Sequence, residues 1–218
     1  MRVLLLLVVC SLLTGTGGSA AAASFDCAKA GTRAEKLICA TPELSKADEE
    51  LGRQYKAARA ATRDAKGLRQ AQMGWIRRHR DACADAACMR KAYEQRIAEL
   101  RATARPGGRT GTYSVDDNTL EILEIAPGVL RFEFLGLWNT GVDVNTGQLC
   151  GEITIKGNTS RGTYGRKEDD CQLAWTFRKD GGVTIRQEGL CDFGANVTAA
   201  GTYKRERSDA PALTLCYE

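Results

Sequence analysis

Apolar positions in the first half of the chain recur at helical spacing. Leu44, Ala47, Leu51, Tyr55 and Ala58 follow one another at steps of three and four residues, so they form one apolar stripe along a helix. The same pattern continues in two later stretches, one with Leu68, Trp75 and Ile76 and the other with Met89, Tyr93, Ile97 and Leu100. The pattern predicts a small helical bundle.

Two start signals add detail to this bundle. Thr32 followed by Glu35 is a capping box, which predicts a short helix that ends near Cys39. Thr41 followed by Pro42 is a second start, with Thr as the N-cap and Pro at the first helical position.

Apolar positions in the second half alternate instead. In "LRFEF", Leu130, Phe132 and Phe134 share one face of a strand, and Arg131 and Glu133 share the other. The stretches "EITIK", "QLAWTF" and "GVTIRQ" repeat the alternation, and "GTY" at positions 111, 162 and 201 indicates strand starts. Turn signals such as "APG", "NTG" and "DGG" separate about eight short strands, which favour an antiparallel β barrel or sandwich.

Composition places a boundary between the two patterns. Residues 24–105 are rich in Ala, Arg, Lys, Glu and Leu, whereas Gly, Thr and Val dominate after the breakers Pro106, Gly107 and Gly108. The chain is therefore expected to be α+β with two separate modules, a helical one at 24–105 and an all-β one at 109–218, joined by a linker at 106–108. Lys and Arg exceed Asp and Glu by seven in the first module, and fall short by four in the second.

The first 23 residues resemble a secretory signal. Arg2 provides a positive start, "VLLLLVVCSLL" is a short apolar run, and "GTGGSAAAAS" offers small residues for cleavage near Ala23 and Ser24. Bulky Val9 before Cys10 disfavours the lipoprotein alternative. No later run reaches the roughly 20 apolar residues of a membrane-spanning helix. We expect an exported protein, periplasmic or secreted, without a transmembrane segment.

Eight of the nine cysteines lie after the leader, and an even number in an exported chain predicts disulfides. Their wide spacing and the single histidine, His79, disfavour zinc. Two straight helices could not bring both Cys27–Cys88 and Cys39–Cys83 into register, so local pairing is favoured. The pairing ranked first is Cys27–Cys39, Cys83–Cys88, Cys171–Cys191 and Cys150–Cys216, the third from a hairpin that folds about position 181.

Few residues suggest chemistry. The acidic run Glu168, Asp169 and Asp170 could bind calcium or supply catalytic carboxylates, but a solvated turn is the favoured interpretation. Trp75 is expected in the core, and "RRHR" at 77–80 on a solvated face. No phosphate loop, metal cluster or nucleophile motif is present in the sequence. We expect no enzyme activity, no cofactor and no nucleic-acid partner.

Several stretches of the first module carry a family resemblance: "FDCAKA", "EKLIC", "PELSKADEELGRQY", "QMGWIRRHRDAC" and "CMRKAYEQRIAEL". They resemble the N-terminal module of the LprI-type lysozyme inhibitor family, with its aromatic-Asp-Cys start and its E-K-x-I-C segment. The resemblance covers most of residues 24–100 and includes four cysteines; the second module shows none. It implies a binding protein that blocks lysozyme by protein–protein contact.

Charge then favours one module for that contact. Animal-type lysozymes are basic, so the positive helical module should repel them and the negative strand module should attract them. The sequence therefore predicts Glu168, Asp169 and Asp170 as partner-binding residues. The alternative is an envelope or host-interaction protein of the same architecture without lysozyme affinity.

Overall fold

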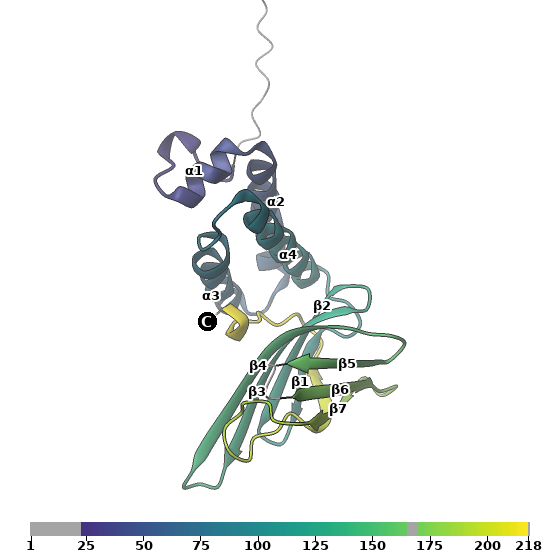
Figure 1. Ribbon diagram of the computed structural model, residues 1–218. Helices are drawn as coiled ribbons and strands as arrows, with labels where there is room; N and C mark the ends of the chain where they lie inside the picture. The colour runs from purple at the N-terminus through teal and green to yellow at the C-terminus, as the bar shows by residue number, and fades with distance from the viewer. Residues whose placement is uncertain (1–22, 165–169, 218) are drawn as a thin grey trace, which may run out of the picture.

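The computed structural model describes residues 23–164 and 170–217, apart from the side chain of Cys216. Helices occupy the first part of the chain and an antiparallel sheet the second, and the two parts stack end to end (Figure 1). The expected α+β architecture is confirmed. No helix in the described part of the chain is long and apolar enough to cross a membrane.

The helical part is a compact set of short helices, listed here in chain order: η1 (Cys27–Lys29), α1 (Arg33–Ala40), α2 (Pro42–Ala61), α3 (Ala65–Trp75), the π-helical turn η2 (Ile76–Arg80) and α4 (Ala86–Ala104). The predicted capping box is present, because the Thr32 hydroxyl accepts from Glu35 N and the Glu35 carboxylate accepts from Thr32 N. Pro42 begins α2 as predicted, but the Thr41 side chain makes no cap hydrogen bond.

The predicted apolar stripes form the helical core. Its fully buried members include Leu44, Leu68, Trp75, Met89 and Tyr93. The rings of Trp75 and Tyr93 meet edge to face, with centroids 5.3 Å apart. Trp75 is thus a core residue, as expected.

Disulfides staple both parts of the chain. The structure contains the predicted pairs Cys27–Cys39, Cys83–Cys88 and Cys171–Cys191, with Cα atoms 5.7, 5.5 and 4.6 Å apart. Cys150 is also disulfide-bonded. Its predicted partner is Cys216, whose side chain lies outside the described residues.

The second part is a nearly closed antiparallel barrel of eight strands, which are β1 (Gly111–Val115), β2 (Asn118–Ala126), β3 (Val129–Asn139), β4 (Val144–Thr154), β5 (Thr159–Tyr164), β6 (Cys171–Phe177), β7 (Val183–Glu188) and β8 (Gly201–Arg207). Their order in the sheet is β4-β3-β2-β1-β8-β7-β6-β5. The alternating residues of the sequence fill the interior, where Phe132 packs on Trp175 with ring centroids 4.7 Å apart.

Two details of the strand prediction are wrong. The "GTY" at 162 lies inside β5, although those at 111 and 201 begin strands. The β6–β7 hairpin pairs Phe177 with Val183, so it folds about position 180 and Cys191 lies beyond the end of β7. Glu133 lies on the outer face of β3 as predicted, but it is also buried.

The C-terminal segment explains the burial of Glu133. After β8 the chain turns back toward the helices, and Thr214 and Leu215 cover a small pocket of about 250 Å³ that Glu121 and Glu133 also line. Tyr217 then inserts into the helical core and is only 4% exposed. A Cβ on Gly74 of α3 would lie 2.5 Å from the Tyr217 carbonyl oxygen, so this close approach requires glycine.

A buried polar cluster joins the two parts at Tyr217. The Glu99 carboxylate on α4 pairs with Arg96 at 2.7 Å and with Arg131 of β3, and it accepts a hydrogen bond from the Tyr217 hydroxyl. The Arg96 guanidinium lies 4.9 Å from the centroid of the Tyr217 ring. We call Arg96, Glu99, Arg131 and Tyr217 the seam cluster.

Candidate functional site

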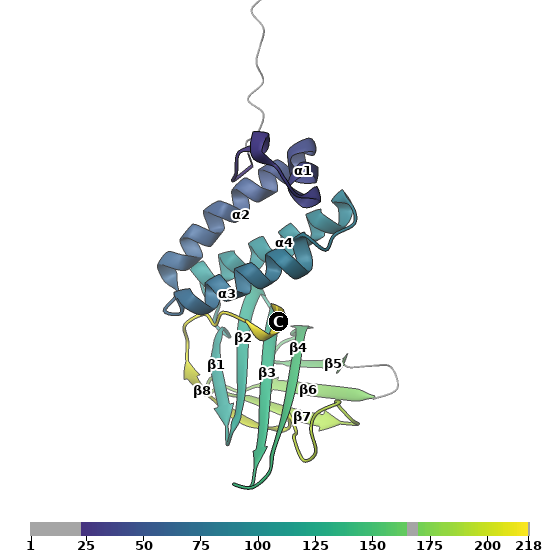
Figure 2. The same cartoon turned by 90° about the vertical axis from the view of Figure 1, so that its left-hand side faces the viewer.

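Antiparallel connectivity places two hairpin turns at the end of the barrel that points away from the helices. The β1–β2 and β3–β4 connections lie there (Figure 2). The chain between β7 and β8 reaches the same end, because Gly194 N donates to Thr146 O and Asn118 Nδ2 donates to Thr198 O. Asp170 is joined to this chain through the Cys171–Cys191 disulfide. We call the described residues of these connections, 116–117, 140–143, 170 and 189–200, the distal end.

The distal end is acidic. Its charged residues are Asp116, Asp117, Asp143, Asp170 and Asp192, all exposed, and its described residues contain no Lys or Arg. The β3–β4 tip with Asp143 lies far from the seam cluster. From Arg131 to Asn139, β3 advances eight residues, which is about 26 Å along the strand. A charge at the β3–β4 tip, such as that of Asp143, is thus about three Debye lengths from Arg131 at roughly 0.15 M salt.

Exposed apolar side chains accompany these carboxylates. Among the described residues, five large apolar side chains are exposed, and four of them lie on or beside the distal end: Leu137, Val142, Val144 and Leu190. Val142 is 89% exposed and Leu190 is 76% exposed. Apolar anchors surrounded by charged groups are typical of protein-binding surfaces.

The longest distal connection is held in a fixed shape. Gly194 N donates to Thr146 O at 3.0 Å, and Asn145 Nδ2 donates to Ala195 O at 2.9 Å, so residues 189–200 are tied to β4. The Phe193 ring packs on Phe134 with centroids 5.2 Å apart. The surface next to Leu190 is therefore built on a stapled, hydrogen-bonded loop.

The structure places the three predicted partner-binding residues differently. Glu168 and Asp169 lie outside the described residues. Asp170 is exposed, has a left-handed φ of 45°, and directly precedes Cys171. Because Cys171 is bonded to Cys191, Asp170 belongs to the same surface as Leu190.

The other four distal aspartates were not predicted from the sequence as partner-binding residues. Three of them carry a turn signal that could have found them: Asp116 and Asp117 form a tight turn between β1 and β2, and Asp143 closes the turn at the tip of the β3–β4 hairpin. Such signals predict a turn, but they do not show at which end of the barrel the turn lies. The number and order of the strands are needed to assign that end.

The "RRHR" stretch is exposed as predicted at Arg77, Arg78 and His79, but it also contacts the C-terminal segment. Arg78 Nη1 donates to Tyr217 O at 2.5 Å, and the His79 ring lies edge-on to the Tyr217 ring with centroids 5.2 Å apart. Burial and the nearby Arg131, Arg96 and Arg78 lower the pKa of His79, so its neutral form is favoured near pH 7. The stretch thus contacts Tyr217 of the seam cluster, and Arg77 and Arg78 also line a groove.

That groove is basic. It has a volume of about 450 Å³ and runs between α3 and the C-terminal segment, with four cationic side chains in its lining: Lys66, Arg69, Arg77 and Arg78. All four residues are exposed. The groove is suited to anionic groups rather than to a cationic partner.

Two carboxylates lie side by side beneath the C-terminal segment. Glu121 and Glu133 are direct cross-strand neighbours on β2 and β3. Burial raises the pKa of Glu121, and Arg207 opposes that shift. Thr214 and Leu215 line the same small pocket of about 250 Å³ as the pair. Within the described residues, no group of His, Cys, Asp and Glu is arranged to hold a metal ion.

Comparison with known proteins identifies the helical part. Residues 26–100 match the family model for lysozyme inhibitor LprI. The matched LprI module begins at Asp26 and ends in α4, so it spans about a third of the chain and leaves the barrel outside. No curated protein and no solved structure matches the chain. The predicted resemblance of the helical module is confirmed.

Proposed function

We propose that the protein is an exported lysozyme inhibitor that binds its target through the distal end of the barrel. The match of the LprI module supports inhibition by protein contact rather than catalysis. The acidic and apolar composition of the distal end is the observation that favours this surface over the helices.

Charge explains why the barrel is the better contact. A basic lysozyme that approaches the helical module meets the exposed cations of the basic groove, so it is repelled. At the distal end the five aspartates attract it, and the helical charges are screened over the intervening strand length. Exposed Val142, Val144 and Leu190 then supply the apolar contact that charge alone does not give.

Association kinetics with a basic animal-type lysozyme test this proposal. One variant changes Glu168→Gln, Asp169→Asn and Asp170→Asn, and a second changes Asp116→Asn, Asp117→Asn and Asp143→Asn. Each removes three negative charges, so the expected effect is a several-fold slower association at low salt that diminishes at high salt. A matched control changes Glu43→Gln, Glu49→Gln and Glu94→Gln, three exposed helical carboxylates.

The control should associate at nearly the wild-type rate. A further variant with Lys66→Gln, Arg69→Gln and Arg77→Gln should associate equally fast or faster, because it removes positive charge from the groove. Loss of inhibition in this groove variant, with no effect in the two distal variants, would assign the contact to the LprI module instead.

A second candidate function is contact with another envelope or host component. The basic groove is the observation that favours it, because a groove with four cations suits an anionic partner. If the protein bound an anionic envelope polymer and inhibited none of the lysozymes tested, this candidate would be favoured over the first.

A further inference from the structure

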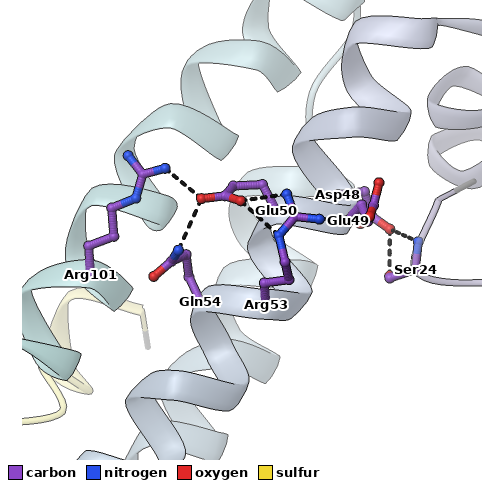
Figure 3. A network of polar contacts seen from close by, with 7 residues as sticks. All are labelled: Ser24, Asp48, Glu49, Glu50, Arg53, Gln54 and Arg101. Carbon is purple, nitrogen blue, oxygen red and sulfur yellow. Dashed lines mark hydrogen bonds and ion pairs between the residues drawn. The ribbon is translucent and has the colours of Figure 1, made fainter. Parts of the chain in front are cut away.

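Asp48 of α2 is a buried carboxylate at the N-terminal edge of the helical core. Only 2% of the residue is exposed. Its Oδ1 accepts from the Tyr93 hydroxyl at 2.7 Å. Its Oδ2 accepts from both Ser24 N at 2.8 Å and Ser24 Oγ at 2.5 Å (Figure 3). Ser24 therefore provides two of the three donors that hold this carboxylate.

A buried carboxylate is unfavourable unless it is well bonded or paired with a cation. No ion pair found among the described residues includes Asp48. Arg80 is near enough to interact with it electrostatically, but the Arg80 Nε donates to Asp81 at 2.7 Å. The Oδ2 side of Asp48 thus faces a backbone nitrogen rather than a cationic side chain.

Ser24 is also the residue that follows the predicted cleavage site. Ala21 and Ala23 are the small residues that a signal peptidase requires at the third and first positions before the cut. Cleavage after Ala23 makes Ser24 N the α-amino group of the mature chain. The same atom that now donates as an amide then carries a positive charge.

We propose that removal of the leader between Ala23 and Ser24 creates an ion pair between the new α-ammonium group and Asp48, and that this pair completes the helical core. The inference rests on the exported state proposed above. It assigns to the N-terminus a structural role at a specific carboxylate of the LprI module.

The geometry favours this change. The nitrogen already lies 2.8 Å from Asp48 Oδ2, the usual separation for an ammonium–carboxylate hydrogen bond. A charge-assisted bond is about twice as strong as the neutral bond that it replaces. The other titratable groups that line this pocket are Tyr55, Arg69 and Arg80, and Tyr93 faces Asp48 from α4. The two arginines oppose the ammonium, whereas Asp48 contacts it directly.

The test compares mature chains that differ only at the N-terminus. One begins with free Ser24, made by exact proteolytic removal of a fusion partner, and the other begins with Nα-acetyl-Ser24. Chemical unfolding is measured from about pH 6 to pH 10. Unperturbed α-amino groups have a pKa of about 7.7–8.0. Pairing with Asp48 should raise this by about one unit, a tenfold preference for the ammonium form.

The sign of the pH effect follows from that shift. Because the folded-state pKa is raised, the added stability is fully present below about pH 7.7 and is lost as the pH rises through the folded value. Free Ser24 should therefore be more stable than acetyl-Ser24 near pH 7, and the difference should vanish near pH 10. Asp48→Asn should remove the difference.

A direct titration keeps the proposal testable if Asp48→Asn fails to fold. The pH dependence of α-amine acylation in the native free-Ser24 chain reports the same pKa, with urea-unfolded protein as the reference. Equal pKa values in the two states, or identical stability of the free and acetylated chains, would overturn the ion pair. Mass spectrometry of the exported protein should give Ser24 as the first residue, and another N-terminus would overturn the maturation step. Neither readout depends on lysozyme binding.

Discussion

Tyr217 offers the sharpest test of how the barrel is joined to the LprI module. Its ring fills the helical core between Arg96 and His79, and its hydroxyl donates to the buried Glu99 carboxylate. Tyr217→Ala removes both the ring and the hydroxyl. Tyr217→Phe removes the hydroxyl alone.

The expected losses differ in size. Truncation of a buried aromatic side chain to alanine costs about 3–5 kcal/mol, because it removes apolar burial and leaves a cavity. Loss of one hydrogen bond to a charged group costs about 1.5–3 kcal/mol. Glu99 keeps its two arginine partners in Tyr217→Phe, so the loss in that variant should lie near the lower limit.

The assay is urea unfolding followed by the helical circular dichroism signal at constant pH, with disulfides intact. For a chain of this size, about 3–5 kcal/mol also corresponds to roughly 6–20 °C in the melting temperature. Val142→Ala, at the exposed barrel tip, is the control and should change stability by less than about 0.5 kcal/mol. If Tyr217→Ala changed helix stability no more than this control, Tyr217 would not belong to the helical core.

Three further predictions concern the rest of the chain. All eight cysteines of the mature chain should be oxidised, so mass spectrometry of the unfolded, non-reduced protein should find no alkylated thiol; two or more would contradict this. Fragments 24–105 and 109–218 should fold separately, with helical and sheet circular dichroism signals respectively. The helical fragment should be less stable than the same helices in the full chain, because it lacks Tyr217. An unfolded helical fragment with intact disulfides would argue against autonomous modules. Burial raises the pKa of Glu121, so its ionised form is disfavoured in the folded state. Glu121→Gln should therefore stabilise the protein more near pH 7 than near pH 3. An equal effect at both pH values would refute burial as the cause of the shift.

The helices were predictable because their signals are local. A capping box needs only Thr32 and Glu35, and an apolar stripe needs only residues one turn apart, so Leu44, Leu51 and Ala58 indicated their own burial. The strands were predictable for a similar reason. Alternation along β3 assigned Phe132 and Phe134 to the interior without reference to any other strand.

Long-range features could not be derived in the same way. Alternation assigns Glu133 to the outer face, but its burial depends on the C-terminal segment that returns across β3. Tyr217 has no periodic neighbours at the end of the chain, so nothing local indicated that it fills the helical core. The acidic run at 168–170 was found as a charge cluster, whereas the position of Asp116 and Asp143 at the distal end follows only from strand order.

The central claim is that this protein inhibits lysozyme, and a lysis assay tests it most directly. Purified mature protein is mixed with each of several lysozymes, including a basic animal-type enzyme, and the rate of bacterial cell-wall lysis is measured against protein concentration at low and physiological salt. We predict saturable inhibition of the basic lysozyme, stronger at low salt, and weakened when Asp116, Asp117 and Asp143 are changed to Asn. Unchanged lysis by every lysozyme tested, at protein concentrations well above that of the enzyme, would contradict the proposed function.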